Sequence, residues 1–184
     1  IYFKFLCETL ELTISEDKLI SFMKHDINVL RVLDIAKTIH HDIKSIELYL
    51  KEVYIELNIG PKKYIEYIHF GLTSQDINSV AFSLQLKDAI TEVIIPKLDA
   101  FIKLLSQKAS LWDNLIILAY THGQPAIPST LGKEMRVFIE RVTHCLDKLK
   151  GHTYYTKIGG AVGTLAAHYY VFPDISWNEH LKAL

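Results

Sequence analysis

Residues 121–130, THGQPAIPST, carry a histidine in a setting suited to acid–base chemistry. His122 lies among small, polar and proline residues directly before a strongly patterned helix, so we expect its side chain at a surface rather than in a packed core. Two prolines restrict the backbone, and Gly123 permits a turn that other residues adopt only at a cost. The segment is therefore predicted to be a rigid catalytic loop, with Ser129 or Thr130 capping the next helix.

Two further polar segments stand at the ends of expected helices. The triplet HHD at 40–42 ends one helical pattern, and TSQD at 73–76 begins another. Free backbone amides at a helix start, joined by the hydroxyls of Thr73 and Ser74, suit the binding of a carboxylate or a phosphate. The same residues could equally be simple helix caps, and their spacing alone favours capping.

The elements that must position these segments are almost all helical, because apolar residues recur with a period close to 3.6. A long helix with a kink at Pro96 suggests a bundle whose helices pack lengthwise, across subunits if the chain assembles. A short β-rich run at 115–120 leads into the segment of His122. Helices are expected at 15–24, 26–39, 43–57, 77–105 and 130–150, the last ended by Gly151.

Composition excludes several classes of protein. The 184 residues are 49% hydrophobic, which is ample for a core, and 20 Lys and Arg stand against 21 Asp and Glu. This balance gives no reason to expect a nucleic acid or an anionic membrane as partner. Cys7 and Cys145 are too few and too far apart for a disulfide framework, so a soluble, cytoplasmic protein is expected. The chain begins with Ile and stops inside an apparently helical stretch, which suggests a fragment.

Metal and triad chemistry find little support in the sequence. Nine histidines are present, but His40 and His41 are adjacent and cannot both face one ion from a regular helix. No HExxH spacing and no GxSxG elbow occurs. We therefore expect no metal and no cofactor.

Four segments together resemble the fumarase/aspartase superfamily and, within it, the bacterial-type adenylosuccinate lyase family. They are HHDIKSIELYLKE, EYIHFGLTSQDIN, THGQPAIPSTLGKEM and KIGGAVG, in the order and at the intervals of that family. The resemblance implies an all-α fold built as a long-helix bundle. It also implies that residues 1–68 are the end of the first domain and that 69–184 are the first half of the central helical domain.

The resemblance further implies a carbon–nitrogen lyase of purine nucleotide biosynthesis. Such enzymes release fumarate by β-elimination from adenylosuccinate, giving AMP, and from the succinylated imidazole carboxamide ribotide SAICAR, giving AICAR. His122 would be the general acid that protonates the departing nitrogen. The remaining site residues implied are His41, with His40 and Asp42, at the nucleotide; Thr73 and Ser74 at a succinyl carboxylate; and Thr121 and Gln124 in support.

Family members are homotetramers whose active sites are shared between three subunits, and their catalytic base is a serine on a loop expected beyond Leu184. This chain alone is therefore expected to be inactive. Two alternatives stay open: another lyase of the superfamily, such as argininosuccinate lyase or fumarase, and a non-catalytic helical interaction module in which His41, Thr73 and His122 are ordinary caps.

Overall fold

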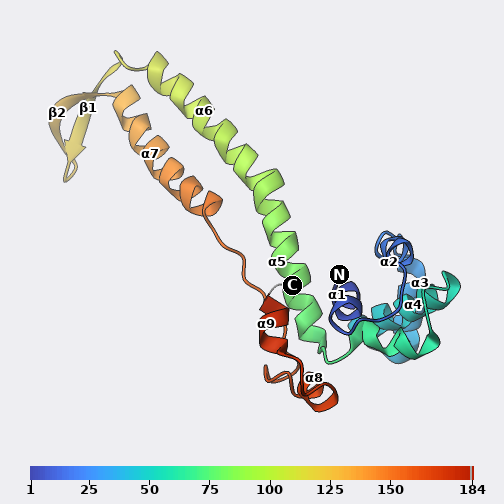
Figure 1. Ribbon diagram of the computed structural model, residues 1–184. Coiled ribbons are helices and arrows are strands. Elements are labelled where there is room, and N and C mark those ends of the chain that lie inside the picture. The colour runs from blue at the N-terminus through green and yellow to red at the C-terminus, as the bar shows by residue number, and fades with distance from the viewer. Residues whose placement is uncertain (183) are drawn as a thin grey trace. The chain divides into compact units, whose positions relative to one another are not determined.

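A computed structural model describes residues 1–182 and 184, which form two compact units. The first comprises Ile1–Val80 together with Thr156–Leu184, and the second is Ala81–Tyr155. Helices dominate both units, as the periodicity predicts (Figure 1). None of the described helices is long and apolar enough to cross a membrane. The domain boundary expected after residue 68 stays a prediction.

The first unit is a cluster of short helices. Ser15 stands at the start of the second helix as expected, although its hydroxyl makes no capping hydrogen bond there. The helices are α1 (Tyr2–Thr9), α2 (Glu16–Met23), α3 (Val29–Ile39), α4 (Asp42–Glu56), the 3₁₀ helix η1 (Lys62–His69), the start of α5 (Ser74–Asp88), α8 (Ala166–Val171) and α9 (Trp177–Lys182).

Two aromatic clusters hold this unit together. In the first, the rings of Phe3, Phe22 and Tyr54 meet edge to face, with centroids 5.7 to 6.1 Å apart. In the second, the buried residues Leu6 and Trp177 pack with partly buried apolar side chains from η1 and from α8 and its flanks. Because α1 contributes to both clusters, it joins the N-terminal helices to the segment that follows residue 156.

Helix α4 buries Ile43 and Val53 on its inner face, as its apolar stripe predicts. Glu47 departs from the usual placement of a charged helix residue in solvent: its side chain is buried between Lys44, 2.7 Å away, and Lys51, 2.9 Å away. Burial works to raise the pKa of Glu47, but the two ammonium groups outweigh burial and the pKa lies below its ordinary value. Two cations thus keep this carboxylate ionised inside the unit.

The second unit is a pair of antiparallel helices joined by a β-hairpin (Figure 1). Helix α6 (Ile95–Leu111) runs to the hairpin and α7 (Leu131–Lys150) returns from it. Arg136 forms a two-armed ion pair with Asp113 near the hairpin, and Lys150 reaches Asp99 over 3.2 Å at the other end. Exposed ion pairs of this kind add little stability each, and here they mark the contact between the two helices at both ends of the pair.

The long helix expected over 77–105 exists, with an irregularity close to the expected place. Helix α5 continues into a π-helical turn, η2 (Ala89–Ile94), and then into α6, whose first turn contains Pro96. Proline has no amide hydrogen for the helical ladder, and a π turn accommodates such a gap by changing the hydrogen-bond spacing. The sequence thus predicted where the α-helix is interrupted.

The hairpin replaces the loop expected at 121–130. Strand β1 (Ile116–Thr121) pairs antiparallel with β2 (Gln124–Thr130), so most of the predicted loop is strand. A register shift between Leu118 and Tyr120 lies opposite the part of β2 that contains its two prolines. A two-stranded sheet has only edge strands, which tolerate prolines, and this is why THGQPAIPST can be extended.

Candidate active site

His41 occupies the N-cap position of α4. Its Nδ1 accepts a hydrogen bond from the backbone amide of Lys44 over 3.2 Å. In a neutral ring, the proton must then be on Nε2. That nitrogen lies 3.5 Å from Oγ of Ser74, at the start of α5, a distance that allows only a weak hydrogen bond. The cap therefore fixes the tautomer and turns the Nε2 proton toward the TSQD segment.

The other two members of the triplet shape the joint between α3 and α4. His40 ends α3 in the left-handed conformation, with a φ of 53°. Asp42 accepts from the amide of Ile43 over 2.7 Å. Its carboxylate also lies 3.3 Å from Nδ1 of His41, but this contact becomes an ion pair only when the imidazole is protonated, because Nδ1 otherwise accepts from Lys44. All three side chains are exposed.

Thr73 and Ser74 form the turn that begins α5, as predicted. The amide of Thr73 donates to Oδ2 of Asp76 over 2.9 Å, and the amide of Asp76 donates back to the carbonyl of Thr73 over 3.0 Å. This reciprocal pair is a helix cap in which the acidic side chain serves the backbone. It leaves the hydroxyl of Ser74, next to Nε2 of His41, on the same side of the unit as the triplet.

Asp76 is the residue whose importance was missed, because its sequence position suggested nothing beyond capping. Its carboxylate is 1% exposed and also accepts from the amide of Gly159 over 3.2 Å and from that of Gly160 over 3.0 Å. Nζ of Lys157 lies 2.8 Å from Oδ1. KIGGAVG, a weak motif by itself, is thus the segment that binds the carboxylate at the end of TSQD.

The ionisation of Asp76 follows from these contacts. Burial works to raise the pKa of Asp76, but the hydrogen bonds from Lys157 and from the amides of Thr73, Gly160 and Gly159 outweigh burial, and its pKa lies below its ordinary value. A carboxyl group whose pKa falls on folding stabilises the folded state at every pH above its unfolded pKa. Asp76 is therefore a charged, structural anchor of the turn.

Replacing Asp76 with asparagine is expected to lower the free energy of unfolding by about 2 kcal/mol at pH 7, because one neutral oxygen cannot serve three amides and the ammonium of Lys157. The deficit should persist down to about pH 4, the unfolded pKa, and shrink as the pH falls through the lower folded pKa. Chemical unfolding of the full-length protein at several pH values measures it. Asp17→Asn, at an exposed first turn, is the control and should change stability by less than about 0.5 kcal/mol. An equal deficit in both variants would contradict the anchoring role.

Two further histidines lie close to this turn and were not singled out from the sequence. Burial lowers the pKa of His69, which stands at the end of η1 with Glu47, Lys44 and Asp76 among its charged neighbours. His168 is fully buried, and its ring lies against Gly71, where an added Cβ would approach Cε1 to 2.3 Å. The closeness of His69 to TSQD in the sequence could have suggested His69, but no sequence signal pointed to His168.

His168 is held by an aromatic cage. Its Nε2 lies 2.7 Å from the hydroxyl of Tyr2, which donates to the carbonyl of Phe70 over 2.7 Å, and its ring meets Trp177 edge on. Burial lowers the pKa of His168, so the ring is neutral at pH 7. Its Nδ1 is buried without a hydrogen-bond partner among the described residues. The ring therefore acts as packing beneath the turn rather than as an acid.

His122 and its neighbours belong to the second unit. His122 and Gly123 are the two central residues of the hairpin turn, with φ values of 51° and 73°, and Thr121 pairs with Gln124 across it. Positive φ at both central positions characterises the tight type I′ turn, whose twist matches that of the strands. The imidazole is exposed at the tip of a short hairpin. Thr130 caps α7 as expected, accepting from the amide of Lys133 over 3.3 Å.

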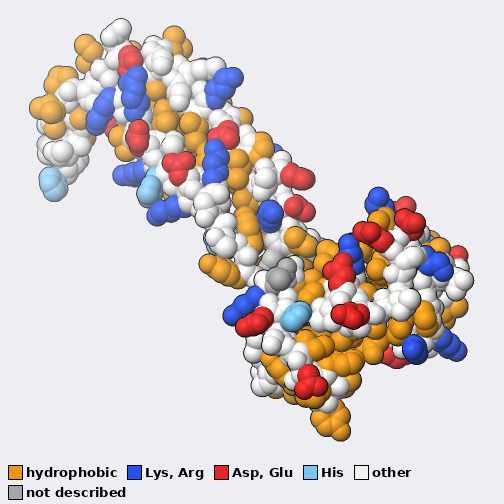
Figure 2. Space-filling view, in the orientation of Figure 1, with side chains coloured by type: hydrophobic (Ala, Val, Ile, Leu, Met, Phe, Trp, Pro, Cys, Tyr) orange, Lys and Arg blue, Asp and Glu red, His pale blue; other side chains and the backbone are white. Residues whose placement is uncertain are grey.

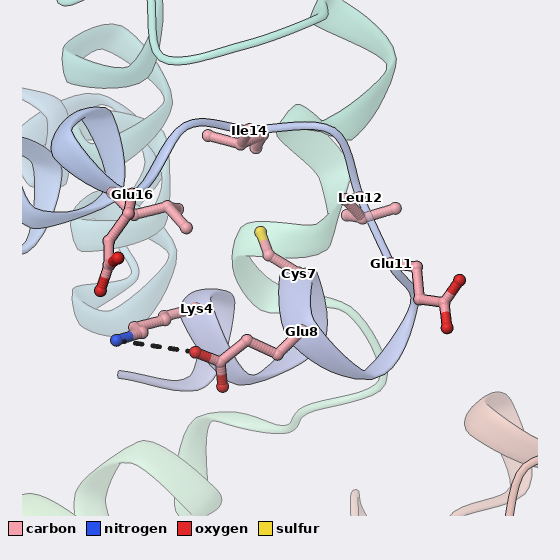
Figure 3. A pocket seen from close by; sticks show the side chains of 8 residues that line it. Lys4, Cys7, Glu8, Glu11, Leu12, Ile14 and Glu16 are labelled. Atoms are coloured by element: carbon pink, nitrogen blue, oxygen red, sulfur yellow. Dashed lines mark ion pairs between the residues drawn. The ribbon is translucent and has the colours of Figure 1, made fainter.

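A surface pocket of about 300 Å³ in the first unit contains none of the predicted site residues (Figure 3). Lys4 and Glu8 form an ion pair of 3.6 Å across its lower side, and the sulfur of Cys7 points into it. Burial raises the pKa of Cys7 to about 11, so the group is a thiol rather than a nucleophilic thiolate at neutral pH. Within residues 1–182, no group of three or more His, Cys, Asp or Glu side chains is arranged to hold a metal ion.

Comparison with known proteins adds the deciding observation. A family model described as lyase matches residues 13–179, nearly the whole chain. The chain belongs to this lyase family. Two solved structures share its fold: a fumarate lyase from Mesorhizobium sp. BNC1 aligns with 98% of this chain and 43% of its own, with a TM-score of 0.73 and 22% identity. A 3-carboxy-cis,cis-muconate lactonizing enzyme from Pseudomonas putida aligns with a TM-score of 0.69, also at 22% identity, over 98% of this chain and 42% of its own.

Among sequences, this lyase chain is similar to adenylosuccinate lyases, as its four motifs predict. It is 43% identical to that of Dictyostelium discoideum over 80% of this chain, and 37% identical to that of Haemophilus influenzae over 84%. It is also 37% identical to that of Escherichia coli over 86%. These alignments cover 32%, 34% and 34% of the three relatives, so the chain spans about one third of their length.

Proposed function

We propose that these residues act within an adenylosuccinate lyase of purine nucleotide biosynthesis. The reaction is the β-elimination of fumarate from adenylosuccinate, which yields AMP, and from SAICAR, which yields AICAR. The observation that carries the proposal is the 37–43% identity to three adenylosuccinate lyases over 80–86% of the chain. No cofactor is required, since the reaction needs only a base, an acid and donors for a developing negative charge.

In this proposal the described segments divide the chemistry between them. Thr73 and Ser74 present their side-chain hydroxyls at the start of α5 to one carboxylate of the succinyl group, while the amide of Thr73 stays bonded to Asp76. His41, with its proton on Nε2, adds a neutral donor beside Ser74 and helps to position the nucleotide, with His40 and Asp42 at its side. A serine outside residues 1–184 would remove the proton beside the carboxylate, as the family resemblance implies.

His122 would then protonate the nitrogen as its bond to carbon breaks. The side chain stands at the tip of a tight turn whose two central residues both have positive φ, which sets the direction of its Cα–Cβ bond. Thr121 and Gln124 pair across the turn and hold it closed. A histidine suits this step because its ordinary pKa lies near neutral pH, so the proton can be given up and recovered.

We also propose a homotetramer in which three subunits contribute to each site. The support is the apolar surface of the second unit: Phe82, Leu104 and Phe138 are each more than half exposed, and Ile116 and Ile127 of the hairpin are 73% exposed. Figure 2 shows hydrophobic side chains on the visible surface of the hairpin. Two helices with open apolar faces are half of a bundle, and further copies of the same helices would complete it.

The free thiols of Cys7 and Cys145 are in keeping with a cytoplasmic setting.

The proposal is tested by assaying the full-length lyase against adenylosuccinate, argininosuccinate and malate, following fumarate by absorbance. Turnover of adenylosuccinate alone is the expected result. Preference for argininosuccinate or malate would replace it with another lyase reaction of the superfamily. If the protein neither turns over any of the three nor binds AMP and fumarate in a calorimetric titration, the chain is a helical interaction module instead.

A further inference from the structure

A buried negative charge lies directly beneath the proposed carboxylate site. Asp76 is two residues from Ser74, is 1% exposed, and bonds through Oδ2 to the amide of Thr73, which is part of the turn that would hold the substrate. A carboxylate at this place opposes the approach of a second anion, and the low dielectric of a buried site strengthens the opposition. A site for a doubly charged succinyl group therefore needs something that cancels the charge of Asp76.

Lys157 is the one cation that the described structure places on this carboxylate. Its Nζ lies 2.8 Å from Oδ1 of Asp76, and the same ammonium donates to the carbonyl of Gly160. The Lys157 side chain is 42% exposed, whereas that of Asp76 is 1% exposed, so the pair is covered on the side of the carboxylate. The amides of Gly159 and Gly160 complete the set of donors around the carboxylate.

We propose that Lys157 is a positioning residue that offsets the negative charge of Asp76, so that the turn at Thr73 and Ser74 can bind a dianionic dicarboxylate. The inference rests on the proposed function. Lys157 acts through Asp76 rather than by touching the substrate: it neutralises the anchor, so the backbone amides and the hydroxyl of Ser74 determine the local field. The KIGGAVG segment thereby has an electrostatic role in addition to its packing role.

The test separates charge from structure. Lys157→Gln removes the charge but keeps a donor for the carbonyl of Gly160, and Lys157→Arg keeps the charge. In the full-length lyase, Lys157→Gln is expected to raise both KM for adenylosuccinate and the inhibition constant of fumarate about tenfold, with kcat changed less, while Lys157→Arg stays within about threefold. Lys62→Gln, an exposed lysine of the same unit, controls for the loss of one surface charge.

The double variant Asp76→Asn/Lys157→Gln gives the decisive comparison. If the effect is electrostatic, removing the carboxylate as well should restore fumarate inhibition to within about threefold of the wild type, even though thermal unfolding shows the double variant to be less stable. The inference would be overturned if fumarate inhibited the double variant no better than it inhibits Lys157→Gln. It would also be overturned if the inhibition constant of fumarate were the same in Lys157→Gln as in the wild type. If the wild type neither binds fumarate nor turns over adenylosuccinate, the proposed function fails first, and the two failures are told apart.

Discussion

If His122 is the general acid of the proposed lyase reaction, replacing it with alanine should lower kcat for fumarate release from adenylosuccinate by about 10³-fold, because the departing nitrogen would lose its proton donor. KM should change far less, since in the proposed reaction the imidazole acts on the leaving group in the transition state rather than on the ground-state succinyl carboxylates. Steady-state kinetics on the full-length lyase, followed by absorbance, measure both constants. Sedimentation should show the same oligomer as the wild type, because the substitution leaves the exposed apolar residues of the second unit unchanged.

The conformation of the turn dictates the control. With a φ of 51°, alanine at position 122 carries a backbone penalty that histidine shares only in part, so a fall in activity could come from the turn rather than from the lost acid. Asparagine adopts the left-handed conformation more readily, and His122→Asn should show the same loss with the turn preserved. His144→Ala, at an exposed position of α7, should leave kcat unchanged. Near-normal turnover by His122→Asn would exclude the acid role.

The helices and their ends could be predicted because local sequence determines them. Thr130 caps α7, Gly151 follows its last residue, and Pro96 marks the interruption of the long helix. Each of these is a property of a few neighbouring residues, either a side-chain oxygen near free amides or a missing amide hydrogen. The family resemblance was readable for the same reason, since its motifs are short and contiguous.

The parts that could not be predicted depend on contacts distant in the chain. The strand Gln124–Thr130 forms only because Ile116–Thr121 pairs with it, and a segment rich in prolines gives no strand signal of its own. Asp76 read as a cap because its partners at Lys157, Gly159 and Gly160 are more than eighty residues away. The burial of Glu47 could not be predicted either, because its two lysine neighbours would also suit a solvated helix face. Periodicity reports which face is apolar, but it does not report which charges are buried in pairs.

Gly71 lies against the ring of His168, far away in the sequence, and leaves no room for a side chain. Gly71→Ala is expected to lower the free energy of unfolding by about 4 kcal/mol. Two effects combine. The φ of 68° is unfavourable for alanine, and the new Cβ would lie 2.3 Å from Cε1 of the His168 ring, which is buried and cannot withdraw. Chemical unfolding of the full-length protein measures the loss.

A matched glycine separates the two effects. Gly163 has a φ of 76° with nothing within 4 Å of its would-be Cβ, so Gly163→Ala carries the backbone cost alone and should lose only about 1 kcal/mol. The remaining loss in Gly71→Ala belongs to the collision with His168. The double variant Gly71→Ala/His168→Ala should therefore lose about 2 kcal/mol less stability than the two single variants lose together, because removing the ring makes room for the methyl group. Additive losses would show that the ring does not press on Gly71, and the turn that carries Thr73 and Ser74 would then owe its position to Asp76 rather than to His168.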